Sequence, residues 1–570
     1  MTKYFPLTVY CLLASNLLWA QRHDNFTHAD TLRGSITKER AWWDVLTYDI
    51  TVKPDFKSKT ITGKNSIKYA ILRPRDTVMQ IDLQYPLVID SVIQHDRRID
   101  FRKIDSNVWF VRTLPGTIKV ASTAATGSVL NNPDSLTVYY HGKPREAFNP
   151  PWDGGWIWKS DNLGRPWMSV ACQGLGASVW YPCKDHQSDE PDKGASLSII
   201  VPDTLVAVAN GRLISQESSN DGTTTWKWIV KNPINNYNII PYIGKYVNWS
   251  DTLHGEKGTL DLNYWVLDYN IDTAKRQFRQ AKPMLRSLEY WFGPYPFYED
   301  GYKLVESPHL GMEHQSAVAY GNGFHNGYRN HSGWIDLSAT GWGFKWDFII
   351  EHESAHEWYG NNITSKDVAD MWIHESFANY SETLYTEYLY GKEAGNEYNY
   401  GIRKRIRNNV PIIAHYGVNE ESNSLDMYYK GGNMLQTVRH VINDDTKWRN
   451  ILRGLNKTFY HQTVTTQQVE NYITKSSGVD LTRTFDQYLR NTTIPVLEYY
   501  YSADKKQVFY RWDSCVSGFN MPLVLMYEGK SLRIYPTEKW KQLSDVSFFD
   551  PSQIDKNYYI HLKQVQREHL

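Results

Sequence analysis

Residues 351–360 read EHESAHEWYG, in which two histidines lie four positions apart and a glutamate directly follows the first. On an α-helix this spacing places His352 and His356 on one face, about one turn apart. Neutral imidazole binds zinc readily, and Glu353 could lie beside the metal and accept a proton from water without being a ligand. The apolar residues of the preceding segment FKWDFII can bury such a helix. The stretch therefore predicts a buried helix that presents two zinc ligands and a general base.

A catalytic zinc site needs a third protein ligand and an open fourth position. Eighteen residues separate His356 from Glu375, and they include a turn-forming Gly-Asn-Asn run at 360–362. Apolar residues at helical spacing surround Glu375, namely Ile373, Phe377, Tyr380, Leu384 and Tyr388. They predict a second helix. A helix, a loop and a second helix would bring either Glu375 or its neighbour His374 to the metal, and Asp370 or Glu382 could support the histidines from behind.

The H-E-x-x-H pattern, the interval and the glutamate lie within HEWYGNNIT and DMWIHESFANY. In this setting they resemble the zinc aminopeptidases of the aminopeptidase N family, which also includes leukotriene epoxide hydrolases. The resemblance implies one Zn²⁺ per chain, held by His352, His356 and Glu375, with Glu353 as the general base. It also implies a saddle-like β-rich N-terminal domain, a thermolysin-like catalytic domain and C-terminal domains.

The segment PHLGMEHQSAVAY at 308–320 resembles the G-x-M-E-N exopeptidase motif of the same family. By this resemblance Glu313 binds the free α-amine of the substrate, while Gly311 and Met312 lie along the substrate backbone as an edge. The match departs from the motif at two positions, since Leu310 replaces its first glycine and His314 replaces its asparagine. These departures concern the detailed shape of the amine site.

The segment DMYYKGGNML at 426–435 resembles the Y-x-K-G segment of the family. In this register Tyr428 is the catalytic tyrosine, whose phenol would donate a hydrogen bond to the oxyanion as it forms. Tyr429 is the alternative if the register shifts by one residue.

The segment CQGLGASVWYPCKDHQSDEPDKGA at 172–195 resembles the family segment that ends in P-C-x-D-E-P. Gln173 falls where the family has a glutamate or glutamine that touches the substrate amine. This chain carries extra residues between Asp185 and Asp189, so its loop is longer than the family pattern.

Hydrophobic periodicity divides the rest of the chain into regions. Apolar residues alternate along residues 21–266, as at Tyr48, Ile50 and Val52, which is typical of half-buried antiparallel strands. Helical patterns dominate residues 267–490, beginning with a helix that Asp272 would cap and Pro283 would kink. Alternation returns in residues 491–570. The sequence thus predicts a multidomain α+β protein whose small C-terminal domain is β-rich.

The first twenty residues, MTKYFPLTVYCLLASNLLWA, combine a basic Lys3, an apolar run and a small Ala20 before a polar segment. This pattern predicts a signal peptide over residues 1–20, with an uncleaved anchor helix as the alternative. After cleavage we expect no transmembrane span and an exported protein, either periplasmic or secreted. Three cysteines would remain, and both a bridge and free thiols are consistent with the positions of Cys172 and Cys183.

Charge and motifs together define the expected partners. Lys+Arg and Asp+Glu each number 62, so the formal net charge is zero, which argues against nucleic acid as a partner. We expect an aminopeptidase that acts on peptides with a free N-terminus. The alternatives are an epoxide hydrolase on the same zinc site, an endopeptidase, against which Glu313 argues, and an inactive binding protein of the same fold.

Overall fold

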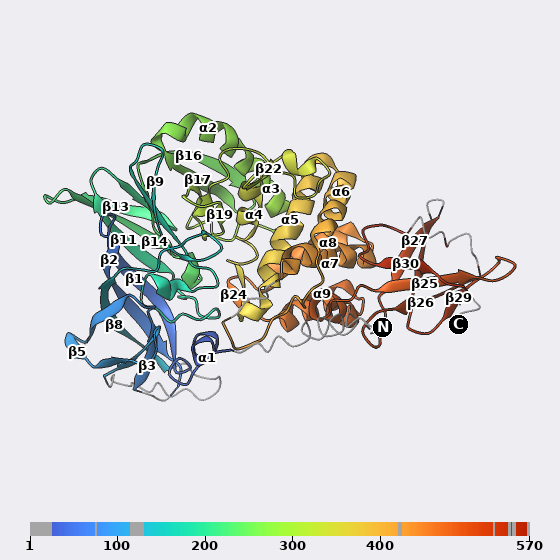
Figure 1. The fold of residues 1–570 in the computed structure, drawn as a ribbon, viewed down its shortest axis with the longest axis horizontal. Coiled ribbons are helices and arrows are strands. Elements are labelled where there is room, and N and C mark those ends of the chain that lie inside the picture. Colours follow the sequence, from blue (N-terminus) through green and yellow to red (C-terminus); the bar gives the residue numbers. More distant parts are fainter. Residues whose placement is uncertain are drawn as a thin grey trace, which may run out of the picture.

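The computed structural model describes residues 26–73, 77–114, 130–419, 424–527, 530–544, 549 and 554–566. The predicted signal peptide, residues 1–20, lies outside them. A β-rich region, a helical region and a second, smaller β-region follow one another along the chain (Figure 1), which confirms the predicted multidomain α+β fold.

The N-terminal region is built on an eight-stranded sheet in the order β13-β14-β11-β1-β2-β8-β4-β5. Its strands are β1 (Trp43–Asp55), β2 (Thr60–Ile71), β4 (Val88–Gln94), β5 (Arg97–Ile99), β8 (Leu130–Gly142), β11 (Ala195–Pro202), β13 (Arg212–Ser218) and β14 (Thr223–Val230). Strands β1 and β11 run parallel, whereas β1 and β2 form a long antiparallel hairpin. Tyr48, Ile50 and Val52 are all buried on one face of β1, as their alternation predicts.

Two smaller sheets complete this region, with orders β12-β15-β10-β9 and β3-β7-β6. Their strands are β3 (Val78–Asp82), β6 (Phe101–Lys103), β7 (Val108–Arg112), β9 (Gly155–Ser160), β10 (Pro166–Ala171), β12 (Val206–Val208) and β15 (Tyr242–Gly244). The short helix α1 (His28–Gly34) precedes them. The sheets share one hydrophobic core that includes the fully buried Trp43, Trp156 and Trp180.

A five-stranded sheet in the order β16-β17-β18-β20-β19 lies between the N-terminal region and the helices. Its strands are β16 (Tyr246–Gly255), β17 (Gly258–Leu267), β18 (Tyr302–Glu306), β19 (Gly311–Met312) and β20 (Val318–Tyr320). Leu304 and Val318 belong to the core of the helical region, whereas Val305 and Ala319 belong to the N-terminal core. The two cores therefore meet across this sheet, and β19 is its edge strand.

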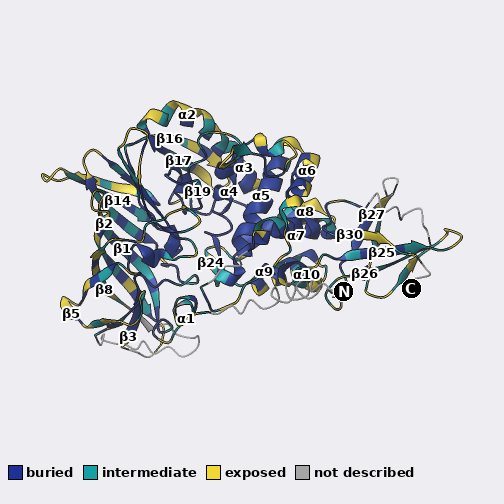
Figure 2. Ribbon diagram, viewed as in Figure 1, coloured by how far each residue is buried: buried dark blue, intermediate teal, exposed yellow. Residues whose placement is uncertain are grey.

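The helical region surrounds a long central helix, α5, whose first four turns are buried (Figure 2). Its helices are α2 (Ile271–Gln277), α3 (Ala281–Phe292), α4 (Phe348–Ala355), α5 (Trp372–Tyr390), α6 (Lys392–Ile402), α7 (Asp426–Ile442), α8 (Asp445–Thr458), α9 (Thr466–Ser477) and α10 (Thr482–Arg490). Short strand pairs join them, β21 (Tyr328–Asn330) with β22 (Gly333–Ile335) and β23 (Ile363–Ser365) with β24 (Gln462–Val464).

The first helix of this region differs from its prediction. A turn of 3₁₀-helix at Phe278–Gln280 separates α2 from α3. Asp272 lies inside the first turn of α2, and Asn270 occupies the N-cap position instead. Pro283 lies in the first turn of α3, and its missing amide hydrogen would have bonded to Arg279, within the 3₁₀ turn that interrupts the helix.

The C-terminal region is a four-stranded sheet, β29-β26-β25-β30, with a separate hairpin, β27-β28. The strands are β25 (Val496–Tyr501), β26 (Val508–Asp513), β27 (Leu523–Tyr527), β28 (Lys530–Ile534), β29 (Lys541–Leu543) and β30 (His561–Gln564). Its buried Trp512 and Leu523 share one core with the helices. Within the described ranges, no helix combines the length and the apolar character that a membrane crossing requires. Cys172, Cys183 and Cys515 are free thiols.

Candidate metal and substrate site

Helix α4 positions the two histidines that the sequence singles out. Asp347 caps its N-terminus, since its carboxylate accepts hydrogen bonds from the backbone N–H groups of Ile349 and Ile350 at 3.1 and 3.4 Å. Every residue of α4 is buried. His352 lies on the helix and His356 at its C-cap, with their ring centroids 5.1 Å apart. Because both ends of α4 are buried, the helix fixes the direction in which the two imidazoles point.

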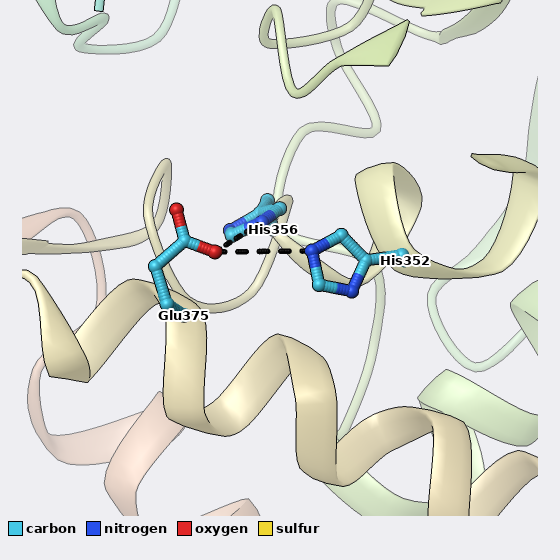
Figure 3. Close-up of side chains that lie close together, drawn as sticks. All are labelled: His352, His356 and Glu375. Carbon is cyan, nitrogen blue, oxygen red and sulfur yellow. Dashed lines mark ion pairs between the residues drawn. The ribbon is translucent and has the colours of Figure 1, made fainter. Parts of the chain in front are cut away.

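Glu375, in the first turn of α5, faces both imidazoles (Figure 3). Its Oε2 lies 3.5 Å from Nε2 of His356 and 3.8 Å from Nε2 of His352. This oxygen is buried and accepts no hydrogen bond from any residue that the structure describes. Ligand atoms about 2 Å from a tetrahedral zinc lie about 3.3–3.5 Å from one another. The three side chains therefore fit a zinc ion, which would occupy the space that their donor atoms surround.

The second ring nitrogen of each histidine, Nδ1, has a hydrogen-bond partner of its own. Nδ1 of His352 lies 2.9 Å from Oε1 of Glu382, and Nδ1 of His356 lies 3.0 Å from the carbonyl oxygen of Tyr359. With Nδ1 as the donor in each pair, Nε2 remains free to bind a metal. Asp370, the other support that we considered, instead accepts hydrogen bonds from the hydroxyls of Tyr416 and Thr466.

His374, the rival third ligand, is directed elsewhere. Its Nε2 accepts a hydrogen bond from the backbone N–H of Ser365 at 2.9 Å. The ring is completely buried, and this burial lowers the pKa of His374 to about 3, so the ring is neutral. His374 is absent from the group of donors that converge around His352, His356 and Glu375.

The acidic groups around the histidines are strongly perturbed. Burial raises the pKa of Glu353 to about 8, although His352 opposes the shift. Burial also favours the neutral form of Glu375, but His356 and His352 outweigh it and lower the pKa of Glu375. Burial opposes the charge of His352, yet Glu375 and Glu382 raise the pKa of His352 well above its usual value. Several carboxylates thus share one buried centre, where a dication would balance their charge.

A second cluster, formed by Glu313, Glu353 and His356, adjoins the cluster of His352, His356 and Glu375. Oxygen atoms of Glu313 and Glu353 and a ring nitrogen of His356 all lie within 4.8 Å of one another. Oε1 of Glu313 accepts hydrogen bonds of 2.8 Å from the amide of Gln173 and from the hydroxyl of Tyr237. Burial raises the pKa of Glu313, with His356 opposing. Glu313 and Glu353 therefore lie directly beside the three-donor centre formed by His352, His356 and Glu375.

Tyr237 is a site residue that the sequence did not reveal. It lies in a short 3₁₀-helix, Asn236–Asn238, of the N-terminal region and reaches Glu313 across 76 positions of sequence. No motif marks Tyr237 in this chain, and its role depends on the docking of two regions. Only a contact map between them could have found it.

Strand β19 runs past the general-base candidate. A methyl group built on Gly311 would lie 2.7 Å from Oε1 of Glu353 and 2.9 Å from the side chain of Ile349, so only glycine fits here without displacement. The other edge of β19 is not paired with any strand of the described sheet, while its inner edge pairs with β20. An extended peptide could add to this free edge. Of the two departures from the motif, His314 is fully buried and bonds through Nδ1 to the hydroxyl of Tyr242.

The two candidate tyrosines separate in the structure. The ring of Tyr428 stacks beside that of His352, with centroids 6.2 Å apart and planes inclined by 26°. Tyr429 instead lies under the guanidinium of Arg405, 5.9 Å from the ring centroid. Tyr428 is thus the tyrosine that faces the three-donor centre.

The comparison with known families finds two matching domain models. The model described as the Peptidase M1 N-terminal domain matches residues 45–237, and the model described as the Peptidase family M1 domain matches residues 298–488. Every candidate zinc-ligand, base, tyrosine and amine-binding residue above falls within these two ranges, whereas residues 238–297 lie between them.

Individual relatives are distant. Aminopeptidase N of Lactobacillus helveticus is 23% identical over 484 residues, which are 80% of this chain and 52% of that protein. Endoplasmic reticulum aminopeptidase 1 of Mus musculus is 20% identical over 508 residues, covering 86% of this chain and 52% of that protein. The chain thus spans about half the length of the curated relatives it matches.

A solved M1 zinc metallopeptidase from Deinococcus radiodurans has the same fold. It is 20% identical, aligns with a TM-score of 0.63, and the alignment covers 80% of this chain and 95% of that one. Two domain models of one family, relatives named aminopeptidases and a shared fold all agree. The chain belongs to peptidase family M1.

Proposed function

We propose that the protein is a zinc-dependent aminopeptidase that releases N-terminal residues from peptides. The observation that carries this proposal is the position of Glu313. Its carboxylate is buried, lies within 4.8 Å of donor atoms of Glu353 and His356, and is held by Gln173 and Tyr237. A buried carboxylate beside a metal centre suits the ammonium group of a peptide N-terminus, since a buried charge needs an opposite charge as its partner.

His352, His356 and Glu375 would hold one zinc ion. Zinc bound there would supply Lewis-acid chemistry, polarising the scissile carbonyl and making water acidic enough to attack near neutral pH. Glu353 takes the proton from the attacking water and delivers it to the leaving amine. Tyr428 donates a hydrogen bond to the carbonyl oxygen as negative charge develops there.

Glu313 sets the position of cleavage after the first residue of the peptide. The substrate ammonium pairs with Glu313, while the substrate backbone lies along the free edge of β19 at Gly311 and Met312. A peptide with an acetylated N-terminus would leave Glu313 buried without a partner, which costs more than the loss of a single favourable contact. Discrimination between free and blocked peptides therefore comes from binding energy as well as from access.

A paired assay tests the proposal. Zinc-loaded protein is given a panel of aminoacyl arylamides with free amines and the same panel with acetylated amines, before and after treatment with a chelator. Turnover of free amines alone, lost on chelation, with one zinc per chain, is expected. Equal turnover of both panels would favour an endopeptidase. Turnover of neither panel by zinc-loaded protein would contradict the proposal and direct attention to lipid epoxides or to a binding role.

A further inference from the structure

A cavity of about 730 Å³ adjoins the proposed site at Leu310, the residue before Gly311. Tyr328, which also lines this cavity, packs edge-on against Phe348, and Phe348 in turn stacks on His352. We infer that this cavity receives the part of a peptide substrate downstream of the scissile bond and binds a carboxylate there through Lys159 and Arg329. The inference rests on the proposed aminopeptidase function and adds a preference for acidic or short substrates.

The direction of the substrate follows from the order of residues along β19. If Glu313 holds the amine, then the first peptide bond lies near Gly311, whose backbone is next to Glu353. The chain beyond that bond must continue past Leu310 and toward Pro308, away from Glu313. Each extended residue advances about 3.3 Å. The second or third residue after the scissile bond therefore reaches the part of the cavity where Pro308 lies.

Two cations line the cavity at that point, and neither has a counter-ion among the residues that the structure describes. Nζ of Lys159, on β9, donates to the carbonyl oxygen of Pro308 at 2.7 Å, and Nη1 of Arg329, on β21, donates to the carbonyl oxygen of Gly321 at 3.3 Å. Neither side chain forms an ion pair with a carboxylate of the described residues. Burial lowers the pKa of Lys159, and the charge of Arg329 lowers it further, so the two cations repel each other.

The cavity has one acidic lining residue, which does not neutralise these cations. Glu306 accepts hydrogen bonds from the backbone N–H of Leu267 and from the amide of Asn270, and burial raises the pKa of Glu306 to about 7. A ligand carboxylate would relieve the repulsion between Lys159 and Arg329 and would take up their free N–H groups.

His309 lines the same cavity beside these cations. It is 5% exposed, and a backbone hydrogen bond with Gly311 involves its ring. Burial lowers the pKa of His309 to about 3, so the ring is neutral and leaves Lys159 and Arg329 as the cations of this wall.

The test compares matched peptides that differ in one carboxylate. Leu-Gly-Gly as the free acid is compared with its C-terminal amide, and Leu-Gly-Glu amide with Leu-Gly-Gln amide. Binding to the zinc-loaded Glu353→Gln variant is measured by calorimetry, and kcat/KM is measured with the wild-type protein. We expect the carboxylate to improve both quantities about tenfold in at least one pair. The first pair isolates a terminal carboxylate, and the second isolates an acidic side chain.

Substitutions of the two cations test whether they cause the carboxylate preference. Combining Lys159→Gln with Arg329→Gln should abolish the preference, whereas Lys227→Gln, which removes an exposed lysine on β14, should keep it. Turnover of an aminoacyl arylamide, which has no downstream carboxylate, should stay the same in all three and also reports correct folding. Equal binding of both members of each pair would overturn the inference, as would a preference that survives the double substitution. If arylamides are not turned over at all, the proposed function fails, while the binding arm still decides the carboxylate site.

Discussion

Glu353 lies within 4.8 Å of both His356 and Glu313, so its replacement can separate metal binding from proton transfer. We expect Glu353→Gln to retain zinc, because Glu353 is outside the group formed by His352, His356 and Glu375. Its kcat should fall by about 10²–10⁴-fold, the usual range for loss of a general base. Metal analysis and arylamide turnover test the two expectations. A zinc-loaded variant with near wild-type turnover would show that another group accepts the proton.

Tyr428 and Tyr429 provide a matched pair of hydroxyl groups. Only Tyr428 stacks beside His352, whereas Tyr429 lies under Arg405. We expect Tyr428→Phe to lower kcat by about 10²–10³-fold with little change in KM, because the lost hydrogen bond acts on charge that develops in the transition state. Tyr429→Phe should stay within a few-fold of the wild-type value. A reversal of these two results would mean that Tyr429, and not Tyr428, is the catalytic tyrosine.

At the scale of single residues, the sequence identified candidates by the spacing that the proposed chemistry needs. His352, Glu353 and His356 are recognisable because the helical repeat alone brings two imidazoles together. Glu375 could be separated from His374 only by a family resemblance, since the periodicity of a helix does not say how the helix is rotated. Tyr237 could not be predicted, because its contact with Glu313 depends on how two regions of the chain dock.

Helix α5 carries Glu375 and Glu382 seven residues apart, two turns along the same face. The first faces the proposed metal and the second holds His352 at 2.9 Å. We expect Glu382→Gln to weaken zinc binding by about 10–100-fold, since the supporting carboxylate orients the imidazole and increases its basicity. Competition with a chelator of known affinity measures the change.

The matched control for Glu382 lies on the same helix. Glu387 pairs with Arg439 at 2.6 Å, away from the metal ligands. Glu387→Gln should lower the melting temperature, because it leaves the buried guanidinium of Arg439 with Asp445 as its one remaining carboxylate partner among the described residues, but it should not alter zinc affinity. Equal loss of zinc affinity in both variants would mean that the effect reflects helix stability rather than the orientation of His352.

Among the elements, sequence patterns predicted type better than boundaries. The alternation of Tyr48, Ile50 and Val52 identified β1, because one face of that strand is buried. The break between α2 and α3 at residues 278–280 was missed, since the apolar stripe continues through it and Phe278 remains in the core. Strand β19, with two residues, is too short for any periodicity to show.

The whole molecule places the site where two hydrophobic cores meet. The sheet that contains β18, β20 and β19 presents Leu304 to the helical core and Val305 to the N-terminal core. Gln173 and Tyr237 come from one side of this junction, and the three zinc-ligand candidates come from the other. The proposed metal centre could therefore form within the helical region, but the complete amine pocket requires both regions in their docked positions.

Lys303, on β18 at this junction, makes the docking sensitive to pH. It is 2% exposed, lies 5.5 Å from the ring of Trp228, and donates to the carbonyl oxygen of Gly211. Burial lowers its pKa from 10.5 to about 7, with Asp300 opposing. Between these values the unfolded chain binds the proton and the folded protein does not. The contribution of Lys303 to stability should therefore rise with pH, by up to about 1.4 kcal/mol per pH unit.

The variant Lys303→Met removes this titration while it keeps an apolar side chain of similar length. Relative to the wild type, its free energy of unfolding should be most favourable at pH 7 and should lose that advantage progressively toward pH 10. Any constant offset, from the unpaired carbonyl of Gly211, does not affect this slope. Lys227→Met, at an exposed position on β14, should show no such trend. A difference between Lys303→Met and wild type that is constant from pH 7 to pH 10 would mean that the lysine stays charged at the junction, and that the two regions dock around an ammonium group.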